Sequence, residues 1–97
     1  MKKLELLFSN EIVLEDSRRM KLDYSLTENY PEEECGEPYY GVQITKYLGE
    51  AVETDEVSGV SYRKDTVISM IQKLFQFEVT PISMAEIIDD FITIGAN

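Results

Sequence analysis

The fold is decided by one stretch, Thr80–Ile87, which reads TPISMAEI and joins two helical segments near the C-terminus. Ser83 and Glu86 have the spacing of a capping box, in which each residue's side chain accepts a hydrogen bond from the other's backbone N–H. Ile82 and Ile87 stand at the two positions of a hydrophobic staple, which fixes the angle at which the chain enters a helix. The stretch therefore predicts a helix that begins at Ser83.

Amphipathic segments lie on both sides of this junction. The first predicts a helix over about 62–76 with Ser61 as its N-cap, and the second predicts a helix over about 83–93 that ends near Gly95. The apolar residues that define the two stripes are Val67, Ile68, Met70, Ile71, Leu74 and Phe75 in the first helix, and Met84, Ile87, Ile88, Phe91 and Ile92 in the second.

The first fourteen residues place apolar side chains at even positions, with one gap at Asn10. These side chains belong to Leu4, Leu6, Phe8, Ile12 and Leu14. The pattern fits either one long strand or a short hairpin that turns at Ser9 and Asn10. We favour one strand, bent or bulged near Asn10, followed by a turn at 15–18.

Two further strands follow from strict alternation, and a fourth is weaker. Met20, Leu22, Tyr24 and Leu26 alternate with polar residues, which predicts a strand with one buried face. The third strand has an inner face of Tyr40, Val42 and Ile44 and an outer face of Tyr39, Gln43, Thr45 and Tyr47. Residues 51–57 hold few aliphatic side chains and fit a charged edge strand, which discourages edge-to-edge pairing. Ser58 and Gly59 then separate the sheet from the helices.

These elements predict a single α+β domain over residues 1–97, with strands within about 3–57. Its architecture is an antiparallel β-meander of three to four strands packed against two C-terminal α-helices in two layers. A chain of 97 residues buries about 60–65% of its unfolded surface on folding, so it needs no metal or disulfide to be stable.

Composition excludes several classes of function. The net charge of −10 disfavours direct binding of nucleic acid or of an anionic membrane surface. There is no histidine and only one cysteine, which rules out an internal disulfide and zinc sites built from cysteine and histidine, and favours a cytoplasmic location. Glu5 interrupts the apolar run after Met1, so we expect neither an export signal nor a membrane segment.

Three segments resemble a known family. They are Tyr40–Ile44 (YGVQI), Val79–Ile82 (VTPI) and Ile87–Ile92 (IIDDFI). They are similar to those of the family catalogued as domain of unknown function 6514, and the resemblance covers about Leu22 to Ile92. It implies a bacterial, cytoplasmic protein without an assigned activity.

The excess of acidic residues is concentrated in the middle of the chain. Residues 22–62 carry one basic and ten acidic side chains, a net charge of −9, whereas residues 1–21 have a net charge of +1. Such a region could bind a basic partner, or it could be a solvated surface without a specific role. The residues that we predict to contact a partner are Glu32, Glu33, Glu34, Tyr39, Tyr47, Glu53, Asp55, Glu56, Asp89 and Asp90.

No catalytic, cofactor-binding or metal-binding residues are predicted. The acidic run Glu32–Glu34 lacks the spacing of a calcium loop, and the glutamates around Cys35 disfavour its thiolate. No nucleophile motif or phosphate-binding loop is present, so we do not expect an enzyme. A small-ligand sensor would need a closed pocket between sheet and helices.

The function that we expect is a non-catalytic protein-interaction module that binds a protein with a basic surface and that could form a homodimer. The alternative is an acidic nucleic-acid mimic, such as a phage-type inhibitor of a nuclease or defence protein, which occupies a basic groove of its target.

Overall fold

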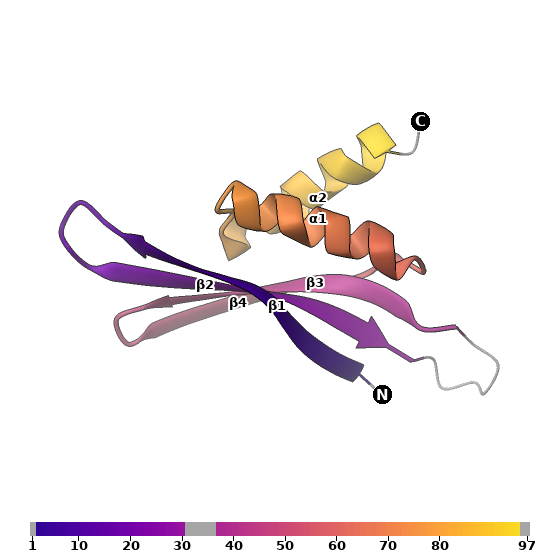
Figure 1. Cartoon of the computed structure of the whole chain (residues 1–97), viewed down its shortest axis with the longest axis horizontal. Coiled ribbons are helices and arrows are strands. Elements are labelled where there is room, and N and C mark those ends of the chain that lie inside the picture. Colours follow the sequence, from indigo (N-terminus) through magenta and orange to yellow (C-terminus); the bar gives the residue numbers. More distant parts are fainter. Residues whose placement is uncertain (1, 31–36, 96–97) are drawn as a thin grey trace.

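The computed structural model describes residues 2–30 and 37–95, which form four strands and two helices in two layers (Figure 1). The strands pair as one antiparallel sheet in the order β1-β2-β3-β4, and both helices lie on the same side of it. The predicted α+β meander with two C-terminal helices is thus confirmed. The elements are β1 (Lys2–Val13), β2 (Arg19–Asn29), β3 (Tyr39–Leu48), β4 (Ala51–Ser61), α1 (Lys64–Gln76) and α2 (Pro81–Gly95).

The hydrophobic core lies between the helices and the helix-facing side of the sheet. It contains the alternate residues Leu22, Tyr24, Leu26, Val42 and Ile44 of the two central strands, and Val67, Ile71, Leu74, Val79, Met84 and Ile88 from the helical segments and their junction. The Tyr24 hydroxyl donates a hydrogen bond to the Val79 carbonyl at 3.0 Å, and burial raises the pKa of Tyr24 to about 12. The alternation that predicted β2 and β3 therefore identified the inner face correctly.

Strand β1 is a single strand, as favoured by the sequence, but its irregularity lies elsewhere than predicted. The register shifts between Leu6 and Phe8, so the bulge is at Leu7 and not near Asn10. A bulge adds one residue and exchanges the faces of the side chains on its two sides. Phe8 therefore packs against the core, whereas Leu4 and Leu6 lie on the other face and are 54% and 56% exposed.

Asn10 interrupts the apolar pattern of β1 because it has a structural role. It is in register with buried Leu22, so it faces the helices. Its side-chain Nδ2 donates a hydrogen bond of 2.9 Å to the carbonyl of Phe75 in the last turn of α1. The same carbonyl accepts a hydrogen bond of 3.2 Å from the Glu78 N–H just beyond the helix, so Asn10 is a second donor that ties the end of α1 to the sheet.

Strand β4 is longer than predicted and contains an irregularity. It continues to Ser61, and Ser58 and Gly59 lie within it instead of separating the sheet from the helices. The register shifts between the pairs Tyr40–Ser61 and Val42–Val57, and Gly59 has a φ of +66°. Glycine tolerates this left-handed conformation, which lets the strand bulge and continue.

Helix α1 begins without a side-chain cap and ends with a backbone cap. Its N-cap is Arg63 and not Ser61, whose Oγ instead accepts a hydrogen bond of 3.0 Å from the Arg63 N–H. At the C-terminus of the helix, Glu78 has a φ of +55°. The Glu78 N–H donates a hydrogen bond to the Phe75 carbonyl, and the Val79 N–H donates one to the Leu74 carbonyl. This pair of hydrogen bonds is a Schellman motif with a glutamate in the position usually held by glycine.

Helix α2 begins at Pro81, two residues before the predicted start at Ser83. Proline suits the first helical position because its φ is already helical and its missing N–H would have no partner there. Ser83 lies within the first turn, where its N–H binds the Thr80 carbonyl at 3.1 Å. Ile82 is 88% exposed, so the predicted staple does not form.

Candidate interaction surfaces

The helices leave one side of the sheet uncovered, and this side is the first candidate surface (Figure 1). We define the outer face as the residues of all four strands that are in register with the odd-numbered residues of β2, from Arg19 to Asn29. Because successive side chains of a strand alternate between faces, this set is the opposite of the core-facing set.

Exposed apolar side chains gather in two places on the outer face. Leu4 and Leu6 lie on β1, while Tyr47 and Val52 form a neighbouring pair on β3 and β4 and are 38% and 58% exposed. Val13, at the end of β1, is exposed as well. Single exposed apolar residues are ordinary, but clusters on an uncovered sheet face mark a candidate interaction site.

The charged residues of the outer face neutralise one another. Each of its three acidic side chains forms an ion pair with a basic side chain of the same face. Glu56 pairs with Lys2, Glu11 with Arg19 at 2.8 Å, and Asp23 with Lys21 at 3.8 Å. The outer face therefore has no net charge, although the whole chain carries −10.

The ion pair between Lys2 and Glu56 joins the two edge strands across the sheet. By the register of the strands, the side chains of this ion pair pass over Thr27 of β2 and near Gly41 of β3. Gly41 has no side chain that would obstruct them. Thr27 is fully buried although it belongs to the outer face, and within the described part of the chain its Oγ1 has no hydrogen-bond partner. The backbone of β4 at Val57 and Ser58 also approaches Gly41 on this face, beside Thr27.

The acidic residues predicted to bind a partner do not share one face. Glu53 and Asp55 are in register with Lys46 and Ile44, which places them on the helix side of the edge strand β4. Glu56 lies on the outer face instead. Asp89 and Asp90 are exposed on α2, the helix that packs most closely on β4. Glu32, Glu33 and Glu34 lie outside the described residues.

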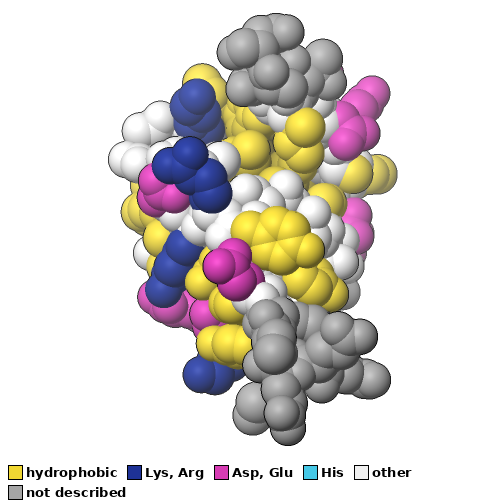
Figure 2. All heavy atoms as spheres, turned by 90° about the vertical axis from the view of Figure 1, so that its right-hand side faces the viewer, with side chains coloured by type: hydrophobic (Ala, Val, Ile, Leu, Met, Phe, Trp, Pro, Cys, Tyr) yellow, Lys and Arg dark blue, Asp and Glu magenta, His cyan; other side chains and the backbone are white. Residues whose placement is uncertain are grey.

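The net charge therefore differs between the outer face and the helix side of the molecule. Figure 2 shows one end of the molecule, where acidic, basic and apolar side chains are interspersed. On the helix side of β4, Glu53 pairs with Lys46 at 3.6 Å, and Asp55 accepts a hydrogen bond of 2.9 Å from the Glu56 N–H. We call Glu53, Asp55, Asp89 and Asp90 the acidic set.

The two predicted tyrosines belong to the outer face, as expected, but differ in exposure. Tyr47 is partly exposed and lies 5.6 Å from the Lys21 ammonium, at the distance of a cation–π contact. Tyr39 is half-buried and meets Tyr62 edge-on, with 6.2 Å between ring centroids. Tyr62 is 66% exposed and was not predicted, because it follows the strand that the sequence appeared to end at residue 57.

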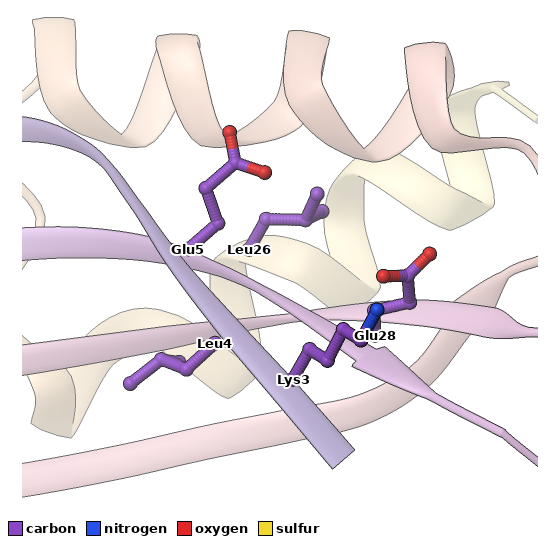
Figure 3. Close-up of a pocket in the computed structure, with 5 residues that line it drawn as sticks. All are labelled: Lys3, Leu4, Glu5, Leu26 and Glu28. Carbon is purple, nitrogen blue, oxygen red and sulfur yellow. The ribbon is translucent and has the colours of Figure 1, made fainter. Parts of the chain in front are cut away.

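Hollows in the described part of the protein are small and lie at its surface. One of about 290 Å³ is lined by Lys3, Leu4, Glu5, Leu26 and Glu28. In Figure 3, Glu5 and Leu26 point toward α1, Leu4 points the opposite way, and Lys3 lies beside Glu28. A second hollow, of about 280 Å³, involves Met70 and Lys73 of α1 and Phe91 of α2. Both volumes are at or below the lower limit for small-molecule sites.

The described residues hold neither a metal-binding cluster nor a membrane-spanning helix. Residues 2–30 and 37–95 hold no group of three or more histidine, cysteine, aspartate or glutamate side chains arranged to bind a metal ion. Within the same residues, neither helix is long and apolar enough to cross a membrane.

Comparison with known proteins assigns the chain to a family through its sequence. No curated protein and no solved structure matches it. A family model, described as a family of unknown function (DUF6514), matches residues 3–94. The match extends over all four strands and nearly all of both helices, including the N-terminal strand that the sequence resemblance had not covered. The chain therefore belongs to the DUF6514 family.

Proposed function

We propose that the protein is a non-catalytic interaction module of the cytoplasm that binds a partner protein with a basic surface through the acidic set. The observation that carries the proposal is the position of Glu53 and Asp55, which project from an edge strand toward the side where α2 presents exposed Asp89 and Asp90. Acidic residues in such an arrangement attract a basic surface and accelerate association.

Two further features support a binding role over catalysis. The chain has no histidine, and its single cysteine is flanked by glutamate and glycine in an acidic run that disfavours the thiolate. The interior between sheet and helices is filled by side chains such as Ile44, Ile71 and Met84, each with no exposed surface. A substrate would have to bind at the surface, where the hollows described are shallow.

The alternative of a nucleic-acid mimic has less support. A mimic needs carboxylates arranged on one surface like phosphates, whereas the acidic residues of β4 divide between two faces and Glu56 is already paired with Lys2. A mimic would also displace DNA from the basic protein that it binds, and a competition assay with any captured nucleic-acid-binding protein would detect this.

The test is affinity capture from host lysate at low salt, followed by elution with a salt step and mass spectrometry. We expect a basic protein that is released by salt, because screening weakens attraction between exposed charges. The double variant Glu53→Gln/Asp55→Asn should reduce its recovery several-fold. The matched control Glu15→Gln/Glu50→Gln removes the same two charges from the exposed hairpin turns and should leave recovery unchanged.

Two results would contradict the proposal. One is equal loss of the captured protein in both double variants, which would show that only the net charge matters. The other is a captured protein that resists the salt step, since binding through exposed carboxylates must depend on ionic strength.

A further inference from the structure

We propose that the outer face is a self-association surface, on which a second copy of this chain packs with its own outer face. This inference concerns the side of the sheet opposite to the acidic set and is independent of the proposed basic partner.

Electrostatics allows two copies to meet at this face. Each chain carries a net charge of −10, so two copies repel one another when their acidic surfaces approach. The outer face carries three basic and three acidic residues, and every acidic one is paired within the face. Contact through this face keeps the unbalanced charges of β4 and α2 on the far sides of both molecules.

The apolar residues of the outer face suit a two-fold arrangement. Leu4 and Leu6 lie on the edge strand β1, in register with Thr27 and Ser25 of β2. Tyr47 and Val52 lie on β3 and β4, toward the opposite edge and in register with Lys21. Between these pairs the face is polar, with residues such as Ser25 and Thr45. With a two-fold axis in the plane of the interface, Leu4 and Leu6 of each copy contact Tyr47 and Val52 of the other. The dimer therefore contains this contact twice.

The area of the face is sufficient for a stable dimer. Four strands about 4.8 Å apart, each about 11 residues long at about 3.4 Å per residue, give a face of about 700 Å². Two such faces bury at most about 1,400 Å², because Ser25 and Thr27 in the middle of each are already buried, and this upper value lies within the range of specific protein interfaces. Twisted sheets pack face to face at about 10 Å. A dimer formed in this way would have two sheets packed face to face, as in a β-sandwich.

The experiment is sedimentation velocity of the full chain over a wide range of protein concentration, at low and at physiological salt. We expect a monomer–dimer equilibrium that salt strengthens, because salt screens the repulsion between the two acidic chains. Salt dependence of the opposite sign is expected for the basic partner, so failure of this inference and failure of the proposed function are distinguishable.

Three variants locate the contact. Leu6→Glu and Val52→Glu place a charge at each of the two apolar pairs of the outer face and should each raise the dissociation constant roughly 10–100-fold. Ile82→Glu is the matched control, because Ile82 is 88% exposed but lies on α2, and it should leave the constant unchanged. If Leu6→Glu does not fold, as judged by circular dichroism, Val52→Glu on the hairpin of β3 and β4 gives the answer.

Three results would overturn the inference. The first is a wild-type chain that is monomeric at every concentration, which would leave the outer face to a different protein or to solvent. The second is a dimer that persists unchanged in a folded outer-face variant. The third is dissociation by Ile82→Glu to the same extent, which would place the contact on the helices.

Discussion

At the scale of single residues, Gly41 shows how the absence of a side chain shapes the sheet. A Cβ on Gly41 would lie 2.3 Å from the Val57 carbonyl oxygen and 2.9 Å from the Ser58 Cα, both of them backbone atoms. We expect Gly41→Ala to lower the free energy of unfolding by about 2–3 kcal/mol or more, because β4 would have to move away. Urea unfolding measures this loss.

The control for that measurement is Gly49→Ala in the turn between β3 and β4. Gly49 also resists substitution, but for a different reason, because its φ is +61° while the space around it is open. Alanine there should cost only about 1 kcal/mol of backbone strain. Equal losses for the two variants would show that the close approach of β4 to Gly41 is not an important constraint.

Tyr24 gives the fold a dependence on alkaline pH. Its pKa is raised by burial to about 12, above the ordinary value of 10.0, so the folded state disfavours the phenolate. This contribution to stability is fully present below about pH 10 and is lost as the pH rises to about 12, with a magnitude of up to about 2–3 kcal/mol. Urea unfolding at a series of pH values from neutral to alkaline follows the loss.

Tyr24→Phe separates that effect from the titration of other groups. The variant should cost about 1–2 kcal/mol at neutral pH, since the buried Val79 carbonyl loses its donor. It should also flatten the alkaline decline in the free energy of unfolding. An unchanged decline in Tyr24→Phe would assign the pH dependence to other residues.

At the scale of elements, the end of α1 is a site where the sequence is not optimal. Glu78 adopts the left-handed conformation that L side chains rarely favour, and a glycine would relieve the strain. We expect Glu78→Gly to raise the free energy of unfolding by about 0.5–1 kcal/mol, measured as a higher midpoint in urea. Glu78→Ala serves as the control, because it removes the same charge but keeps the strained backbone; an equal gain from alanine would mean that charge, not conformation, is responsible.

Most elements could be predicted from the sequence because their periodicity is strong. Leu22, Tyr24 and Leu26 alternate without a fault, and the stripes of both helices are complete. Their ends were less predictable because several local signals competed. The capping-box spacing of Ser83 and Glu86 was outweighed by Pro81 at the first helical position. From the sequence, Ser58 and Gly59 are expected to end the sheet, whereas Gly59 lies in a bulge within β4, which is the other role that glycine takes in strands.

At the scale of the whole molecule, the sequence predicted the layers but not the surfaces. The even positions of Leu4, Leu6 and Phe8 place all three side chains on one face of a regular strand. The bulge at Leu7 turns Leu4 and Leu6 to the outer face instead, where they become part of the proposed dimer contact. The bulge could not be located from the sequence, because Leu6, Leu7 and Phe8 are all apolar and fit a strand with or without an extra residue. The pairing of charges within the outer face was equally hidden, because Lys2 and Glu56 are 54 residues apart.

The hydrogen bond from Asn10 to Phe75 has a consequence for how the molecule opens. Phe8 also stacks on Phe75, with ring centroids 4.8 Å apart, so two neighbouring residues of the edge strand hold the last turn of α1. Peeling β1 from the sheet would unwind that turn, and fraying of the helix end would in turn loosen β1. We therefore expect the backbone amides of both segments to exchange with solvent through one shared opening event, although they lie more than sixty residues apart in the chain.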